Sequence, residues 1–177
     1  MFTLRTERLL LRDWKDADRP LFAKMNADSR VMEFMPGPLS PEASDQLVEK
    51  IQHHFRKHGF GLCAAELLDD HTFIGFIGLA VPSFEAAFTP CVEIGWRLAA
   101  EHWARGLAPE GARAVVTHAF RDLGLDELVS YTVAPNVRSR RVMEKLGMTH
   151  DPAEDFDHPR LPAGHPLRRH VLCRLHR

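Results

Sequence analysis

A glycine-containing turn at residues 103–108 is the first stretch whose residue types suggest ligand binding. It reads Trp-Ala-Arg-Gly-Leu-Ala, with Arg105 and Gly106 at its centre, and it lies between a predicted strand and a predicted long helix. Small residues let a backbone approach a ligand closely, and the free N–H groups of a helix N-terminus attract a phosphate or pyrophosphate. Pro109 contributes no N–H group. The turn therefore suggests an anion cradle, and an ordinary strand-to-helix turn is the alternative.

A second polar stretch follows the next predicted strand. Asn136 and Ser139 are three residues apart, which places them on one side of a helix. Asparagine is also a common helix N-cap, and serine is common on exposed helix faces, so each residue alone has an ordinary structural interpretation. The nearby Arg138, Arg140 and Arg141 indicate either attraction of a phosphate or a solvated helix face.

Apolar spacing and breaker residues predict the elements that hold these stretches. Residues 4–12 predict one strand buried on both faces, followed by a helix that Asp13 or Asp16 caps and that buries Leu21, Phe22 and Met25. Further along the chain, we expect a helix from Ser40 and Pro41 to Gly59, a hairpin at 60–68 and 72–81, a strand at 91–98, a helix at 108–121, a strand at 128–133, a helix at 136–146, and strands at 148–150 and 170–175. This order predicts an α+β or α/β chain with a mixed sheet.

Three stretches together resemble the Gcn5-related N-acetyltransferase (GNAT) family. They are the strand Glu93-Ile94-Gly95-Trp96-Arg97-Leu98, the glycine turn, and the block Asn-x-x-Ser-x-x-x-x-Glu-Lys-x-Gly-Met that ends at Met148. The opening Thr-Glu-Arg-Leu-Leu-Leu-Arg at residues 6–12 is similar to the ribosomal-protein N-terminal acetyltransferases within that family. The motifs occur in the family's order along nearly the whole chain, which is more specific than any single motif.

The resemblance implies a fold and a ligand. We expect one N-acetyltransferase domain over residues 1–177, with a mixed, largely antiparallel sheet of about seven strands and about four helices. Acetyl-CoA would lie where the strands at 91–98 and 128–133 splay apart. Its arm and phosphates would contact backbone groups, and its acetyl end would contact side chains. By resemblance, the cofactor-binding residues are Trp96, Arg97 and Leu98 for the pantetheine arm, Arg105, Gly106, Leu107 and Ala108 for the pyrophosphate, Asn136 for the pantetheine or acetyl end, and Ser139 near the thioester sulfur.

The family reaction is direct attack of an amine on the thioester, which needs a proton acceptor, an oxyanion donor and help for the departing thiolate. Glu93 is the candidate base, although strand alternation places it on the face opposite Trp96, and a surface glutamate is the alternative. Ser139 is the candidate donor to the thiolate. Many members place a tyrosine where this chain has Met143, which cannot donate a proton.

Two further departures concern aromatic residues. Tyr131, the single tyrosine, lies near the position where some N-terminal acetyltransferases carry a catalytic glutamate, and a half-buried strand aromatic is the alternative. Trp103 replaces the usual Gln or Arg at the start of the glycine turn. This replacement affects only the contact that the side chain would make with the coenzyme, and the backbone contacts of the turn are unaffected.

Composition restricts the remaining possibilities. The 23 Lys and Arg residues balance 24 Asp and Glu residues, which argues against a nucleic-acid partner, and no apolar run reaches the length of a membrane span. Three dispersed cysteines favour a cytoplasmic setting, and the reaction needs no metal, although His54 and His58 have helical spacing. We therefore expect transfer of acetyl from acetyl-CoA to a primary amine, on a protein N-terminus or a small molecule. A CoA-binding regulatory module is the alternative, and a homodimer is left open.

Overall fold

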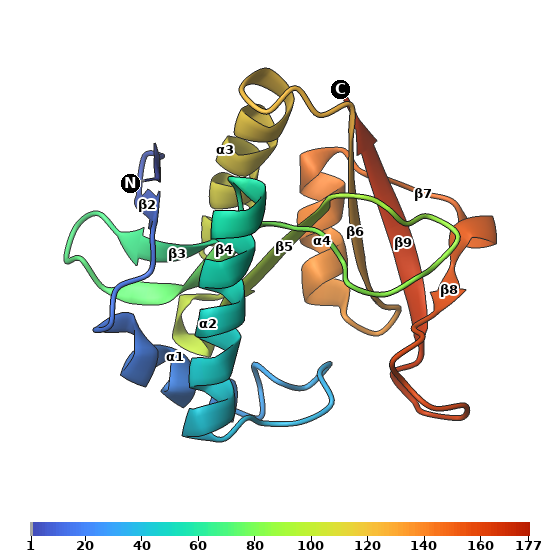
Figure 1. The fold of residues 1–177 in the computed structure, drawn as a ribbon, viewed down its shortest axis with the longest axis horizontal. Coiled ribbons are helices and arrows are strands. Elements are labelled where there is room, and N and C mark those ends of the chain that lie inside the picture. Colours follow the sequence, from blue (N-terminus) through green and yellow to red (C-terminus); the bar gives the residue numbers. More distant parts are fainter. Residues whose placement is uncertain (1) are drawn as a thin grey trace.

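The computed structural model describes residues 2–177, which form one mixed sheet with helices on both faces (Figure 1). The sheet order is β1-β2-β3-β4-β5-β6-β9-β7, with β8 paired to β9. Its strands are β1 (Thr3–Arg5), β2 (Leu9–Arg12), β3 (Leu62–Leu67), β4 (Phe73–Ala80), β5 (Glu93–Leu98), β6 (Glu127–Val133), β7 (Thr149–His150), β8 (Phe156–Asp157) and β9 (Arg169–His176). The helices are α1 (Asp18–Ala27), α2 (Pro41–His58), α3 (Leu107–Arg121) and α4 (Val137–Leu146), with short 3-10 turns η1 (Ala100–His102) and η2 (Pro152–Glu154).

The predicted mixed, mainly antiparallel sheet is confirmed, with nine strands among residues 2–177. One of the extra strands comes from the N-terminus, where the prediction of a single strand over residues 4–12 is wrong. β1 and β2 instead form an antiparallel hairpin in which Leu4 pairs with Leu11. Thr6 closes the turn, because its N–H donates to the Leu9 carbonyl at 2.9 Å and its hydroxyl accepts from the Leu9 N–H at 2.9 Å. Without Gly or Pro, this turn carries no breaker signal.

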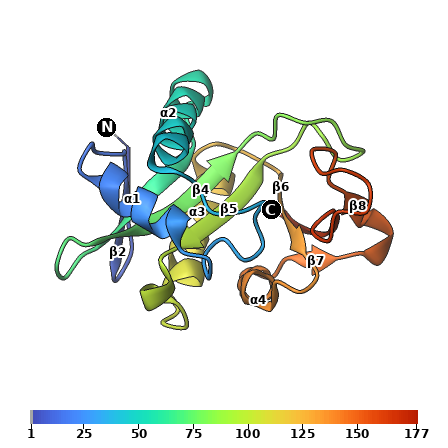
Figure 2. The ribbon, with the colours of Figure 1, turned by 90° about the horizontal axis from the view of Figure 1, so that it is seen from below.

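Two cores lie on opposite faces of the sheet, as strand alternation requires. Ala64 and Phe76 belong to the core beneath α1 and α2, whereas their neighbours Ala65 and Ile77 belong to the core beneath α3. Figure 2 shows α2 and α4 on opposite sides of the sheet. The sheet therefore separates the helical pair α1–α2 from the pair α3–α4.

Local capping signals predicted most helix ends. The Ser40 hydroxyl accepts from the Ala43 N–H at 3.2 Å, and Gly59 ends α2 in the left-handed region with φ of 77°. The beginning of α1 differs from the prediction, because Ala17 is its N-cap and neither predicted aspartate caps it. The predicted burial of Leu21 is also wrong, since this side chain is exposed.

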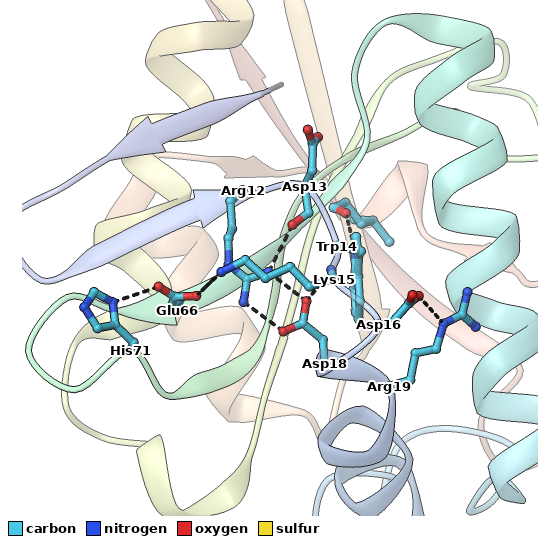
Figure 3. A network of polar contacts seen from close by, with 10 residues as sticks. Arg12, Asp13, Trp14, Lys15, Asp16, Asp18, Arg19, Glu66 and His71 are labelled. Atoms are coloured by element: carbon cyan, nitrogen blue, oxygen red, sulfur yellow. Dashed lines mark hydrogen bonds and ion pairs between the residues drawn. The ribbon is translucent and has the colours of Figure 1, made fainter.

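A buried ion-pair network explains where α1 begins (Figure 3). The Arg12 guanidinium donates two hydrogen bonds to Asp18, at 2.7 and 2.8 Å, and one to Glu66 at 2.6 Å. Lys15 and His71 contact the same Glu66 carboxylate at 3.2 and 3.0 Å. Because each buried charge has an opposite charge in contact, the network ties β2, β3 and α1 together without leaving a charge unpaired.

No helix among residues 2–177 combines the length and the apolar character that a membrane crossing needs.

Candidate functional site

The cleft where β5 and β6 diverge has a volume of about 520 Å³. The strands β5 and β6 are parallel, and they pair only at Glu93 and Val129, where the Val129 N–H donates to the Val92 carbonyl at 2.9 Å. Beyond this point the strands separate, as Figure 1 shows. The predicted splay is therefore present. The starts of α3 and α4 and the segment at residues 28–39 enclose the space between the strands.

The free edge of β5 faces this cleft. The Ala99 N–H donates to the Ile74 carbonyl of β4, so alternation directs the backbone groups of Leu98 and Trp96 away from β4 and toward the cleft. The backbone groups of Arg97 point to β4 instead. Of the three residues predicted for the pantetheine arm, Trp96 and Leu98 thus have the suitable backbone orientation. The Leu98 carbonyl already accepts from the Trp103 indole N–H at 2.8 Å.

The glycine turn leads directly into α3. Gly106 is the N-cap with φ of 78°, and Ala104 also has a positive φ of 57°. Within residues 2–177, the amides of Leu107 and Ala108 donate to no backbone carbonyl, and both residues line the cleft. The Arg105 side chain lies outside the cleft and contacts the His102 ring at 3.3 Å. The turn therefore presents free backbone donors to the cleft.

The first turn of α3 is fixed by a contact that sequence spacing could not reveal. The Thr6 hydroxyl and the Arg8 backbone N–H donate to Glu110, at 2.6 and 2.9 Å, and the Arg8 guanidinium also pairs with its carboxylate. The same guanidinium donates to the Arg105 carbonyl at 3.0 Å. Thr6 and Arg8 thus hold the glycine turn and the first turn of α3 in place.

Asn136 caps α4, as predicted. Its side-chain oxygen accepts from the Ser139 N–H at 3.2 Å, and its amide group donates to the Thr132 hydroxyl at 2.9 Å. Both Asn136 and Ser139 line the cleft, and in the described chain the Ser139 hydroxyl makes no hydrogen bond. Met143 is buried in the core beneath α4. Ser139 therefore presents a free hydroxyl group to the cleft from the first turn of α4.

Arg138 closes one end of the cleft. Its guanidinium lies 4.4 Å from the centre of the Trp103 ring and 5.7 Å from that of Phe34, and it pairs with Glu33 at 2.5 Å. These contacts join α4, the glycine turn and the segment at residues 28–39. Because cation–π pairing has no periodic signature, this contact could not be predicted from the sequence.

Arg141 and Lys145 follow Arg138 on α4 and also line the cleft, whereas the Arg140 guanidinium donates to the Ala134 carbonyl at 3.3 Å. Of the three neighbouring arginines, the structure therefore turns Arg138 and Arg141 toward the cleft.

Glu93 and Tyr131 form a pair at the closed end of the splay. The Tyr131 hydroxyl donates to the Glu93 carboxylate at 2.7 Å, among the rings of Phe84, Phe156 and His158. Burial raises the pKa of Glu93 to about 7, and the hydrogen bond from Tyr131 partly opposes this rise. Burial also raises the pKa of Tyr131. At neutral pH, Glu93 can therefore accept a proton, whereas Tyr131 is a poor acid.

Glu93 lies on the face of β5 opposite Trp96, as alternation predicted, and no bulge interrupts its register with β4. Neither Glu93 nor Tyr131 lines the cleft. Cys91, which precedes the strand, is a free thiol whose pKa burial raises to about 11, so it is a weak nucleophile.

The histidine pair on α2 has a structural role. Both ring nitrogens of His54 are engaged, because Nε2 accepts from the Val81 N–H at 2.9 Å and Nδ1 lies 3.0 Å from the Phe60 carbonyl. His58 stacks against the His54 ring. Across residues 2–177, no three His, Cys, Asp or Glu side chains are grouped as metal ligands.

Residues 8–149 match the family described as acetyltransferase (GNAT) domain. The chain therefore belongs to the GNAT family, a family of acetyl-transferring enzymes.

Similar proteins support this assignment. The FsC-acetyl coenzyme A-N(2)-transacetylase of Aspergillus fumigatus is 32% identical over 155 residues, which cover 84% of this chain and 65% of the fungal protein. An acetyltransferase from Agrobacterium tumefaciens superposes with a TM-score of 0.80 at 31% identity, covering 100% of this chain and 95% of the other. The ribosomal-protein-S5-alanine acetyltransferase from Vibrio fischeri has the same fold, with a TM-score of 0.76 at 16% identity over 99% of this chain and 97% of its own.

Proposed function

We propose that this protein transfers the acetyl group of acetyl-CoA to a primary amine, on a protein N-terminus or on a small molecule. One observation carries the proposal: the unpaired edge of β5 and the free amides at the start of α3 face the same cleft. A hydrogen-bonding strand edge suits the amide groups of a pantetheine arm, and a helix N-terminus suits a pyrophosphate. We further propose that residues 1–177 act as one domain in the cytoplasm.

The residues of the cleft fit this ligand. We assign the pantetheine arm to the backbone of Trp96 and Leu98, and the pyrophosphate to the amides at residues 105–108. Arg141 and Lys145 supply positive charge on the α4 side of the same cleft, which suits a further phosphate. When bound, acetyl-CoA supplies an acetyl thioester that an amine can attack.

Three groups of the chain would serve that attack. The Trp96 backbone N–H faces the cleft and can stabilise negative charge on the acetyl oxygen. The Ser139 hydroxyl can donate to the departing sulfur. Glu93, with its pKa raised to about 7, can accept the proton of the amine through water, because it lies beyond the cleft at the closed end of the splay.

A CoA-binding regulatory module is the second candidate. The observation in its favour is that Glu93 and Tyr131 hydrogen-bond to each other and do not line the cleft. Such a module would bind CoA without turnover.

Release of free CoA from acetyl-CoA distinguishes the two candidates. We would measure it with a thiol reagent over a panel of peptides with free N-termini and small primary amines. Thermal unfolding with and without saturating CoA is measured in parallel, because a ligand that binds only the folded state raises the melting temperature. Stabilisation with turnover supports the enzyme, and stabilisation without turnover on any amine supports the module. An unchanged melting temperature contradicts both.

A further inference from the structure

Arg97 is a half-buried arginine whose Nε atom is buried, and it has no carboxylate partner in the described chain. Its Nη1 donates to the Asn26 side-chain oxygen at 2.8 Å, its Nη2 contacts the Met35 sulfur at 3.5 Å, and its buried Nε has no hydrogen-bond partner. The guanidinium also lies over the Phe76 ring, 5.4 Å from the ring centre. Every partner of this cation is therefore neutral.

Arg12 shows how this chain treats a buried arginine that serves structure. That guanidinium makes three hydrogen bonds to two carboxylates, Asp18 and Glu66 (Figure 3). A buried charge is costly unless an opposite charge compensates it, and burial accordingly lowers the pKa of Arg97 to about 10. Among residues 2–177, no acidic side chain compensates the partly buried charge of Arg97, so its guanidinium can accept an anionic group of a ligand.

The Arg97 side chain is held in place rather than left to move. Asn26 is fully buried, and its amide group donates to the buried Ser44 hydroxyl at 2.9 Å. This bond fixes the orientation of the Asn26 oxygen that accepts from Arg97. Two hydrogen bonds thus link Ser44 of α2, Asn26 of α1 and Arg97 of β5. They fix the position of the guanidinium before any ligand binds, as a residue that selects a substrate requires.

The guanidinium borders the cleft on the face of β5 that carries Glu93. Arg97 and Met35 both line the cleft, and the contact of Nη2 with Met35 is exposed to solvent. Glu93, Gly95 and Arg97 share this face by alternation. Gly95 leaves the space between them open, since a Cβ there would meet only Glu93 at 3.7 Å and Leu62 at 4.0 Å.

This face lies on the other side of the strand from the residues that pack beneath α3. Phe76, the partner of Arg97 on β4, belongs to the core beneath α1 and α2, whereas Trp96 faces the core that contains α3. The phosphate-binding amides are at the start of α3. Arg97 therefore lies on the face of β5 that carries the candidate base Glu93, away from the amides that suit the phosphates of the coenzyme.

We propose that Arg97 binds a carboxylate of the acceptor, so that the preferred acceptor carries both an amine and a carboxylate. This inference rests on the proposed acetyl transfer. A guanidinium binds a carboxylate through paired N–H donors, and Nη2 has only a weak thioether acceptor to give up. On this face of β5, the Glu93 carboxylate would then serve the amine of the acceptor, and the Arg97 guanidinium would bind its carboxylate.

The test compares matched acceptors that differ only in the charged group. We would measure kcat/KM for L-amino acids and for their α-carboxamides with the wild type and with Arg97→Gln. Comparing this acid-to-amide ratio between variants cancels the intrinsic differences between the two acceptors, including the different basicity of their amines. We expect Arg97→Gln to lower this ratio about ten- to a hundred-fold, as for loss of a charged hydrogen bond. Arg97→Lys should keep part of the preference, because it keeps the charge and loses the planar pair of donors.

Arg121→Gln is the matched control, because Arg121 lies at the exposed end of α3 and its removal changes the net charge equally. Its ratio should equal that of the wild type. The dissociation constant of CoA is measured for each variant. An equal loss of activity with acids and amides, together with weaker CoA binding, would place Arg97 in the coenzyme site and overturn the inference. A ratio for Arg97→Gln equal to that of the wild type would also overturn it.

A binding measurement separates this inference from the proposed function. With CoA present, we would record the melting temperature in increasing concentrations of sodium butyrate, with sodium chloride as the ionic-strength control. If butyrate raises the melting temperature of the wild type and not that of Arg97→Gln, the result supports the carboxylate site. This holds even if no amine is acetylated, and in that case only the proposed reaction fails. No stabilisation of the wild type beyond the sodium chloride control contradicts the site even if amides are turned over.

Discussion

Replacing Asn136 with alanine tests whether this residue is a helix cap alone or also a contact for the coenzyme. The variant loses the cap bond to the Ser139 N–H and leaves the buried Thr132 hydroxyl without its donor. A lost cap costs about 1 kcal/mol, and a buried hydroxyl without its partner costs about as much again. For a chain of this size, a sum of about 2 kcal/mol lowers the melting temperature by about 4–8 °C.

Ser40→Ala is a matched control, because Ser40 caps α2 through the same type of bond at the same distance of 3.2 Å and does not line the cleft. This variant should lose about 1 kcal/mol, or about 2–4 °C, and should bind CoA as the wild type does. Loss of one coenzyme hydrogen bond in Asn136→Ala should raise the dissociation constant of CoA about three- to ten-fold.

The assay combines thermal unfolding with calorimetric titration of CoA at a temperature where both variants are folded. A dissociation constant for Asn136→Ala equal to that of Ser40→Ala would show that Asn136 acts only as a cap. The proposed contact with the pantetheine or acetyl end would then be abandoned.

Three further predictions concern the turn, the hydroxyl and the base. Gly106→Val should weaken CoA binding strongly, because φ of 78° suits glycine and the turn carries the free amides; Gly124→Val, with φ of 67° away from the cleft, should cost similar stability and leave CoA affinity unchanged. Ser139→Ala should slow single-turnover acetyl transfer by roughly ten- to a thousand-fold with unchanged CoA affinity, and an equal rate would remove it from the mechanism. Glu93 has a pKa raised from 4.5 to about 7, so wild-type kcat/KM should rise as Glu93 loses its proton near pH 7, and Glu93→Gln should lack this step. By linkage, Glu93 also makes the wild-type free energy of unfolding fall as pH rises from about 4.5 to about 7, and a pH profile of Glu93→Gln that keeps this fall would contradict the assigned pKa.

Much of the fold was predictable from local sequence, because the signals concerned act over a few residues. Ser40 and Pro41 began α2, and Gly59 ended it, since each satisfies or terminates a helix through its own backbone and side chain. Asn136 capped α4 for the same reason. The motif order from the first strand to the block ending at Met148 indicated the family, which the match over residues 8–149 confirms.

Errors in the prediction arose where a distant residue decides the local conformation. Residues 4–12 form a hairpin, because Thr6 and Arg8 bond to Glu110, about a hundred positions away. Helix α1 begins at Asp18, because Arg12 holds that carboxylate in a buried ion pair and is itself held by Glu66, 54 positions away. Neither partner is visible to a rule based on spacing.

Local sequence patterns and the family resemblance together predicted part of the cleft lining: the glycine turn, the strand edge at Trp96 and Leu98, and the pair Asn136 and Ser139. Which charges are compensated depends on the folded structure. It pairs Glu93 with Tyr131 and surrounds Arg97 with neutral partners, and both outcomes depend on which elements the sheet and helices bring together. Burial and charge pairing are properties of neighbours in space, and for this reason the sequence could name the ionisable residues of the site without giving their electrostatic state.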